Sequence, residues 1–449
     1  MSLKKFKQIN YKTILTFFLI FLLGVITGYI ALHRSYALYE ENKNFDVING
    51  TVEDPGDIYF AYYIDGEISR EMPKQNTGYT LDTEKSNCNN GVIPTWDNAG
   101  WKFIGDYHNY NGADNTRTKC TLYFTKTSKT VSTVLGNIEV NSYTPDFTKS
   151  ACDDESCESH EKGIYETTDY DGNPTYYYRG SVENNYVKFA GFYWRIIRIN
   201  SNGSIRMIYD GTSAHGNGES NTDRQYDTIR FNTSNNNNMY VGYMYTSGNA
   251  HGTGTFSTIK TDVDKFYVAK LASYVSKLDT SVGYCGDRST LNLISGAGTG
   301  TVTTYNKGYL RVGEGTPILT CENSNDYYTV SNASNGNKKL SYPIGLITVD
   351  EAMLSGCVGG FFDGYYNHQN TNTTGYLITG ARFWTMTPAG GYNPYGFDYW
   401  TALVFYVQHT GKIDDEYVTV IYGVRPVINI RFDVKITGSG TMSDPYIIN

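Results

Sequence analysis

The alternation of apolar and polar residues along the chain predicts many short strands. Between residues 57 and 127, IYFAYYI and CTLYFTK alternate as half-buried strands do, and Asp65-Gly66 follows the first of them as a turn. Farther along, the pattern predicts two long strands, residues 186–199 and 204–209, around a turn that ends in Asn202-Gly203. We therefore expect a small all-β module over residues 57–127 and a larger domain that begins with strands.

Two segments carry a helical pattern. In residues 262–278 the apolar residues recur every three or four positions: Val268, Leu271, Val275 and Leu278. This spacing predicts one buried stripe. TVDEAMLSG predicts a shorter helix, because Thr348 and Glu351 have the spacing of a capping box, in which each side chain accepts from the other residue's backbone N–H.

The last hundred residues return to strand patterns in ARFWTMTP, WTALVFYVQ and EYVTVIYGVRPVINI. IYGVRPVINI predicts a strand buried in a sheet. Arg425 and Pro426 do not fit that prediction, because proline cannot donate to the ladder and an unpaired buried charge is costly. Strands, then two helices, then strands predict an α+β domain over residues 165–449.

One segment is apolar enough to cross a membrane. Thr13 to Leu32 contains no charged residue, lysines precede it, and no acidic residue occurs before Glu40. The positive-inside rule then predicts a cytoplasmic tail (residues 1–12), a transmembrane anchor (13–33), a stalk (34–56) and an extracellular remainder. A cleaved signal peptide is the alternative, with Ser35-Tyr36-Ala37 as its cleavage site, although the apolar run exceeds the usual length of roughly 7–15 residues.

Charge and composition exclude further classes of protein. Five of the 37 basic residues precede the extracellular part: Lys4, Lys5, Lys7, Lys12 and Arg34. The extracellular part therefore has 32 basic and 45 acidic residues, which gives a net charge near −13. We do not expect nucleic acid as a partner of such an acidic chain. The chain contains 42 tyrosines and only 18% charged residues, which favours a folded recognition surface over disorder. Codon bias in an AT-rich genome would also explain this composition.

All seven cysteines follow the apolar segment, where disulfides persist. Their grouping predicts the pairs Cys88–Cys120, Cys152–Cys157 and Cys285–Cys321, and leaves Cys357 unpaired. The second pair lies in a connector (residues 128–164) with a cluster of metal-ligand types: Asp153, Asp154, Glu155, Glu158 and His160. Their spacing matches neither an EF-hand nor a closed zinc site, so we interpret the cluster as a solvated acidic loop.

Catalytic motifs are scarce. The chain has no G-x-S-x-G or H-E-x-x-H motif, and SGAGTG at residues 295–300 lacks the Lys-Ser/Thr of a phosphate-binding loop. Asp414, Asp415 and Glu416 are candidates for acid–base carboxylates, although adjacent acids between strands more often form a charged turn. We assign no catalytic residue and keep a cell-envelope enzyme that uses these acids as an alternative.

The loop PAGGYNPYGFDYW, residues 388–400, is the strongest candidate for ligand binding. It combines aromatic rings and polar groups in a Gly/Pro-rich segment, a mixture that can stack on sugars or contact a protein. The candidate residues are Tyr392, Asn393, Tyr395, Phe397, Asp398, Tyr399 and Trp400, with Tyr406 and His409 at the end of the next strand. The alternative is a loop that folds on its own aromatic side chains.

From about Tyr176 to Asn449 the sequence resembles a group of surface proteins of gut Firmicutes. The matching stretches are YYYRG, FAGFYWRIIRINSNGSIRMIYDG, YCGDR, YPIGLITVDEA, FWTMTP, GVRPVINI and GSGTMSDPYII. SNCNNG, WDNAGW and KCTLYF resemble a small repeat that accompanies this domain. More distantly, LITVDEA, WTMTP and YGVRP are similar to motifs of the C-type-lectin-like fold in its formylglycine-generating-enzyme variety. The resemblance implies a C-type-lectin-like domain over residues 165–449.

Departures limit what this resemblance implies. Formylglycine-generating enzymes bind copper through two nearby cysteines near the C-terminus, whereas only Cys357 follows Cys321 here. The Glu-Pro-Asn, Gln-Pro-Asp and Trp-Asn-Asp motifs of calcium-dependent lectins do not occur in the large domain, so nothing supports a calcium requirement and we expect no cofactor. The same fold displays variable residues in receptors made by diversity-generating retroelements, and residues 392–420 have a similar composition.

The resemblance gives Arg425, Trp194 and Trp384 structural roles. In a lectin-like domain, GVRP lies in the closing strand after the recognition surface. We predict that carbonyls or a carboxylate inside the domain hold the Arg425 guanidinium, because this planar group has five donors. Pro426 then marks an interruption of the ladder.

These observations predict a single-pass bacterial surface protein, anchored in the cell membrane through Thr13 to Leu32. Its extracellular domain is expected to bind a glycan or a protein through the aromatic loop. The alternatives are the envelope enzyme described above and a purely structural envelope protein.

Overall fold

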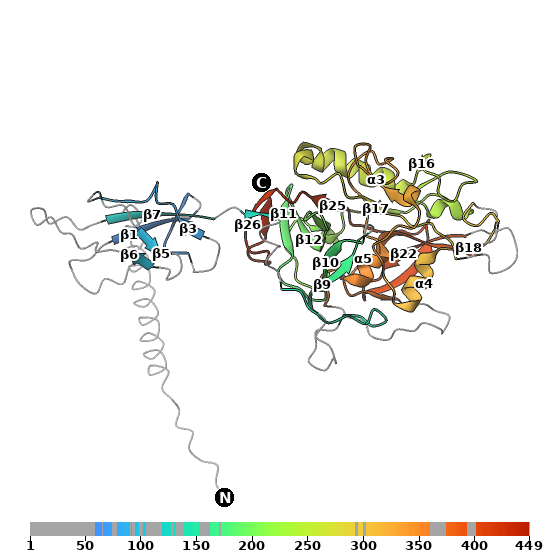
Figure 1. Ribbon diagram of the computed structural model, residues 1–449, viewed down its shortest axis with the longest axis horizontal. Coiled ribbons are helices and arrows are strands. Elements are labelled where there is room, and N and C mark those ends of the chain that lie inside the picture. Colours follow the sequence, from blue (N-terminus) through green and yellow to red (C-terminus); the bar gives the residue numbers. More distant parts are fainter. Residues whose placement is uncertain are drawn as a thin grey trace, which may run out of the picture. The chain divides into compact units, whose positions relative to one another are not determined.

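The computed structural model describes residues 59–64, 66–73, 79–89, 91, 95–97, 102–104, 119–126, 129–131, 139–151, 162–169, 172–291, 295–299, 302–359, 374–392 and 401–448. The chain divides into two compact units, a smaller unit over residues 1–127 and a larger unit over residues 128–449. Figure 1 labels several elements of each unit.

The smaller unit is built around one central strand, β7. Its strands are β1 (Tyr59–Ile64), β2 (Glu67–Ser69), β3 (Tyr79–Leu81), β4 (Asn87–Cys88), β5 (Thr95–Asp97), β6 (Lys102–Ile104) and β7 (Lys119–Lys126). β1 lies parallel to β7, β3 and β4 lie antiparallel to it, and β5 and β6 form a separate pair. Leu122 and Phe124 are fully buried beside the predicted Cys88–Cys120 disulfide, which is confirmed.

The first large sheet of the larger unit has the order β25-β13-β12-β11-β27-β26-β8, with β10 paired to β12 and β9 to β10. Its strands are β8 (Lys129–Thr130), β9 (Gly163–Thr168), β10 (Pro174–Arg179), β11 (Tyr186–Phe189), β12 (Phe192–Ile199), β13 (Ile205–Gly211), β25 (Val427–Ile430), β26 (Lys435–Thr437) and β27 (Tyr446–Ile448). The predicted hairpin at Asn202-Gly203 is confirmed as β12–β13. The single strand expected over residues 186–199 is wrong, because the chain turns at Ala190 and Gly191, whose φ angles are 53° and 83°.

The second large sheet has the order β14-β24-β21-β22-β23-β20, with β18 paired to β21. Its strands are β14 (Asp227–Arg230), β18 (Thr304–Tyr305), β20 (Val358–Gly359), β21 (Phe383–Tyr392), β22 (Thr401–Val407), β23 (Lys412–Tyr417) and β24 (Ile421–Val424). IYGVRPVINI is therefore two strands and not one. The chain leaves the second sheet after β24 and enters the first at β25, and Pro426 lies at this break, where its missing N–H interrupts no ladder.

The helices of the larger unit are short. They are α3 (Thr258–Phe266), α4 (Lys307–Glu314) and α5 (Val349–Leu354), with α4 and α5 beside β22 in Figure 1. The capping box predicted for α5 is confirmed: Thr348 Oγ1 accepts from Glu351 N at 3.1 Å, and Glu351 Oε2 accepts from Thr348 N at 2.9 Å.

The helix expected over residues 262–278 begins earlier and changes its winding. After α3 the chain forms a π-helical turn, η4 (Tyr267–Leu271), and a 3-10 segment, η5 (Ala272–Lys277). Leu271 and Leu278 are buried as predicted, but Val268 and Val275 are 55% and 52% exposed. The stripe was wrong for these two residues because Val268 lies in the π turn and Val275 in the 3-10 segment, and neither keeps the α-helical period.

Shorter elements complete the larger unit. They are the strands β15 (Met244–Tyr245), β16 (Thr255–Phe256), β17 (Tyr284–Cys285) and β19 (Tyr327–Tyr328), and the 3-10 turns η2 (Thr222–Arg224), η3 (Asn238–Val241) and η6 (Ser324–Asp326). The predicted Cys285–Cys321 disulfide is confirmed, and Cys357 is a buried free thiol. The predicted Cys152–Cys157 pair and its acidic loop lie outside the described residues.

The described residues form a strand-rich α+β fold with few helices, in agreement with the predicted class. One large apolar core joins the two sheets and the helices of the larger unit, and Tyr165, Tyr177 and Leu354 form a small second cluster. Among the described residues, no helix combines the length and the apolar character needed to span a membrane. The predicted anchor at residues 13–33 and the stalk at 34–56 lie outside this part of the chain.

Candidate functional site

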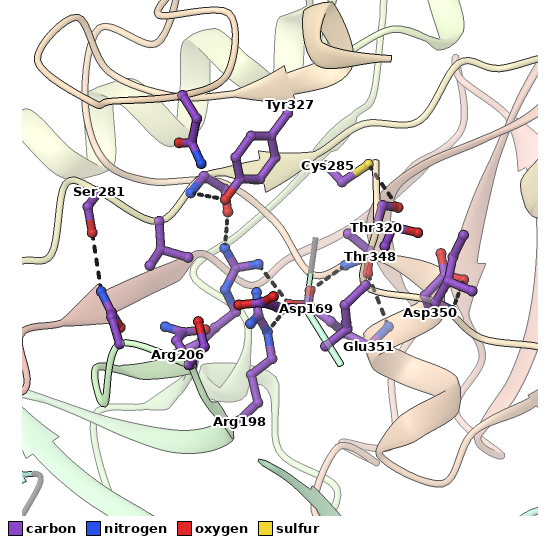
Figure 2. Close-up of a pocket in the computed structure, with 18 of the residues that line it drawn as sticks. Asp169, Arg198, Arg206, Ser281, Cys285, Thr320, Tyr327, Thr348, Asp350 and Glu351 are labelled. Atoms are coloured by element: carbon purple, nitrogen blue, oxygen red, sulfur yellow. Dashed lines mark hydrogen bonds and ion pairs between the residues drawn. The ribbon is translucent and has the colours of Figure 1, made fainter. Parts of the chain in front are cut away.

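The larger unit contains a polar pocket of about 180 Å³. Most of its wall comes from the β12–β13 hairpin, residues 281–287, residues 318–320 and the start of α5, which are far apart in the sequence. Figure 2 shows Arg198 and Arg206 converging on Glu351 inside it. The pocket therefore depends on the tertiary fold and not on one local motif.

Glu351 lies at the centre of the charged groups in the pocket. Its Oε1 accepts from Arg206 Nη1 at 2.7 Å and from Arg198 Nε at 3.0 Å, while its Oε2 is held by the capping box. Arg206 also donates to the Gly283 carbonyl and, at 3.1 Å, to Asn429 Oδ1. Both arginines and the glutamate are buried, so this network orders the pocket floor.

The two guanidiniums differ in how well they are compensated. Burial would raise the pKa of Glu351, but Arg206 and Arg198 outweigh it and lower that pKa to about 2. Burial would lower the pKa of Arg206, yet Glu351 and other partners raise it. For Arg198, burial and the charge of Arg206 lower the pKa despite Glu351. Arg198 is thus the less compensated cation.

A second ion-pair cluster supports one wall. Arg311 donates through Nε and Nη2 to both oxygens of Asp350, at 2.7 and 3.0 Å, and through Nη1 to Asp287 Oδ2 at 2.7 Å. Asp350 and Asp287 raise the pKa of Arg311 against the effect of burial. The carboxylates of Asp350 and Asp287 both accept hydrogen bonds from Arg311, and they therefore connect α5 to residues 287 and 318. Because they are paired in this way, they do not neutralise Arg198.

Several polar atoms of the pocket have no partner within the described structure. Arg198 is 7% exposed, and its only hydrogen bond is from Nε, so both of its Nη groups lack acceptors among the described residues. On the acceptor side, Asn200 Oδ1 and Asn335 Oδ1 are buried without a hydrogen bond to any described group. Because Arg198 lines the pocket, a polar molecule held there would satisfy its Nη donors.

The aromatic-loop candidates are only partly described. Asn393, Tyr395, Phe397, Asp398, Tyr399 and Trp400 lie outside the described residues, and Tyr392 is described only as the last residue of β21. His409 is exposed in the turn between β22 and β23. Tyr406 is 4% exposed and packs against Tyr422, with ring centroids 4.6 Å apart, so its ring belongs to the packed interior. None of the described candidates lines the polar pocket.

The three acids proposed as catalytic alternatives lie in a strand, so the expectation of a charged turn was wrong. Asp414, Asp415 and Glu416 belong to β23, where alternate side chains face opposite sides of the sheet. Gln408 Nε2 donates to Asp414 Oδ2 at 2.9 Å, and the Tyr422 hydroxyl donates to Glu416 Oε2 at 3.2 Å. Burial and then Asp414 raise the pKa of Asp415 to about 7.

The residues given structural roles are all fully buried. Arg425 donates to the carbonyls of Tyr209 and Leu377 at 2.9 and 2.8 Å and to Asp210 Oδ1 at 2.7 Å, the kind of arrangement predicted for it. Burial lowers the pKa of Arg425 to about 10. The indole N–H groups of Trp194 and Trp384 donate to the carbonyls of Phe189 and Ile229.

Sequence reasoning missed the pocket, although one signal was available. In the β12–β13 hairpin Arg198 and Arg206 are directly opposite each other. Like charges in such a pair are destabilising unless an anion lies between them, and Glu351 supplies that anion. The predicted hairpin therefore already placed the two arginines opposite each other. The sequence did not show which acidic residue would neutralise them.

The described residues contain no group of three or more His, Cys, Asp or Glu side chains arranged to hold a metal ion. Comparisons of the chain with known protein families, with characterised proteins and with solved structures gave no match.

Proposed function

We propose that this chain is a membrane-anchored surface protein whose larger unit binds an extracellular ligand in the polar pocket. The observation that carries the proposal is Arg198, a buried arginine whose Nη groups have no acceptor among the described residues and which lines a pocket with unpartnered amide oxygens. Free guanidinium donors at a pocket are available to a ligand, and a purely structural protein does not require them there.

The lectin-like interpretation of the larger unit is part of this proposal. The motif LITVDEA, which carries the resemblance to the C-type-lectin-like fold, supplies Thr348, Asp350 and Glu351 to the pocket. A motif shared for structural reasons alone would not have to reach a pocket. The anchor at residues 13–33 would hold the binding unit outside the cell, and the aromatic loop after β21 would add a second contact with a glycan or a protein.

An envelope enzyme is the second candidate, and one observation favours it. The Asp415 carboxyl, with a pKa of about 7, has the proton affinity of a general acid or base. Its neighbours Asp414 and Glu416 are engaged by Gln408 and Tyr422.

Binding by the purified full-length chain in detergent micelles to arrays of glycans and extracellular proteins tests the proposal. We expect a specific ligand that is lost in Arg198→Gln. If binding is lost only when Tyr395, Tyr399 and Trp400 are all replaced by alanine, the binding site is the aromatic loop. If the protein turns over a glycan of the array and Asp415→Asn abolishes this turnover, the protein is an enzyme.

A further inference from the structure

We infer that the pocket recognises the carboxylate of an acidic sugar, with Arg198 as the residue that pairs with it. This inference rests on the proposed function and specifies its ligand class. Arg198 uses only Nε for Glu351, so the two Nη groups keep N–H donors that no described group accepts. A guanidinium edge of this kind matches a carboxylate, which can accept two parallel hydrogen bonds.

The guanidinium of Arg198 is incompletely paired. Arg198 and Arg206 share one carboxylate oxygen of Glu351, so two guanidiniums have one carboxylate between them. The carboxylates of Asp287 and Asp350 are paired with Arg311. Asp169 also belongs to the pocket lining, so the positive charge available to an anion is local to the Nη groups of Arg198. The lowered pKa of Arg198 agrees with a cation that lacks a full counter-charge.

The remaining lining suits the hydroxyl groups of a sugar ring. Asn200, Ser281 and Asn335 line the pocket with amide and hydroxyl groups, which are the groups that exchange hydrogen bonds with the hydroxyl groups of a sugar. Tyr327 contributes the aromatic side chain of the lining. A pocket of about 180 Å³ is small, which suits a single sugar ring better than a folded peptide segment.

Calorimetric titration of the full-length chain in micelles with glucuronate and with glucose tests the inference, since the two sugars differ only at one carbon. We expect glucuronate to bind about 10- to 100-fold more tightly. Arg198→Gln removes this preference, whereas Arg230→Gln, the same change at an exposed arginine outside the pocket, keeps it. Asn335→Asp retains the acceptor but adds a negative charge, so it weakens glucuronate and leaves glucose unchanged.

Asn335→Asp also keeps the test decisive if Arg198→Gln does not fold, because Asn335 lies at the partly exposed side of the pocket. Equal affinity for both sugars, unchanged in these variants, overturns the carboxylate inference and leaves the proposed function standing. Two other ligands are tested in the same way: inorganic sulfate and a peptide with a free C-terminus. If either binds more tightly than glucuronate and also depends on Arg198, the assignment of the ligand as an acidic sugar is refuted. An array ligand lost in Arg198→Gln, with no binding of glucuronate, also overturns it.

Discussion

Arg425 Nη2 donates to Asp210 Oδ1 at 2.7 Å across 215 positions of sequence. Asp210 belongs to β13 in the first sheet, and Arg425 lies where the chain leaves the second. The same oxygen accepts from Arg224 Nε at 2.9 Å. Arg425 also caps two carbonyl groups, so one side chain joins the ends of three segments where the two sheets meet.

Replacement of Arg425 should destabilise the larger unit strongly. Arg425→Met keeps most of the side-chain volume but leaves the carbonyls of Tyr209 and Leu377 without these donors. We expect a loss of about 3–5 kcal/mol in the free energy of unfolding. Urea denaturation followed by tryptophan fluorescence measures it. Arg382→Met removes an exposed arginine next to β21 and should cost less than about 1 kcal/mol. Equal losses in the two variants would refute the anchoring role.

Glu351 should make the larger unit sensitive to acid. Its pKa falls from 4.5 in the unfolded chain to about 2 in the folded one. The carboxylate therefore contributes stability that is complete above pH 4.5 and is lost as the pH falls toward 2. At 1.36 kcal/mol per pKa unit, the contribution is roughly 3 kcal/mol. Thermal denaturation between pH 7 and pH 2 measures it.

Glu351→Gln provides the control for this pH dependence. The variant should be less stable than the natural chain at pH 7, because Arg198 and Arg206 lose their counter-charge. It should also lose less stability between pH 5 and pH 2, because the titrating group is gone. Parallel pH profiles for the two proteins would contradict the assignment of acid sensitivity to Glu351.

Local signals in the sequence predicted local structure well. The capping box at Thr348 and Glu351 and the turn at Asn202-Gly203 depend on neighbouring residues only, and both are present. The predicted burial of Val268 and Val275 was wrong because a π turn and then a 3-10 segment changed the helical period. The helix propensities of the individual residues do not predict such a change.

The candidate site was harder to predict, because its groups meet only in the folded chain. Arg198 and Glu351 are 153 positions apart, and each has an adequate local role, one in a strand and one in a helix cap. Composition drew attention instead to the aromatic loop, most of which lies outside the described residues. Charged residues in strands that are otherwise apolar were the better guide, since a buried charge requires a partner.

Asp415 should affect stability with the opposite sign to Glu351. Its pKa rises from 3.8 to about 7 on folding, so the folded protein retains a proton that the unfolded chain gives up. The stability of the folded state is therefore lost as the pH rises from 3.8 to 7. Asp415→Asn cannot ionise and should stabilise the protein at pH 8 by up to roughly 4 kcal/mol, with no gain near pH 4. Denaturation at the two pH values measures this, and Asp433→Asn, at an exposed residue, should give no gain.

The two disulfides offer a matched pair of perturbations, because they close segments of similar length, with sequence separations of 36 and 32. Replacing both Cys285 and Cys321 by serine should lower the stability of the larger unit by about 3–4 kcal/mol. It should also loosen the pocket, since Cys285 and Thr320 belong to its lining. Hydrogen exchange of residues 281–287 measures that loosening.

Replacing both Cys88 and Cys120 by serine is the control. This change should cost about as much in the smaller unit, because the loop entropy is similar. It should leave exchange at residues 281–287 unaltered, because Cys88 and Cys120 lie in a different compact unit. Faster exchange there in the Cys88/Cys120 variant would mean that the pocket depends on the smaller unit. Unchanged exchange in the Cys285/Cys321 variant would mean that Arg206, Glu351 and the Arg311 cluster hold the pocket wall without the disulfide.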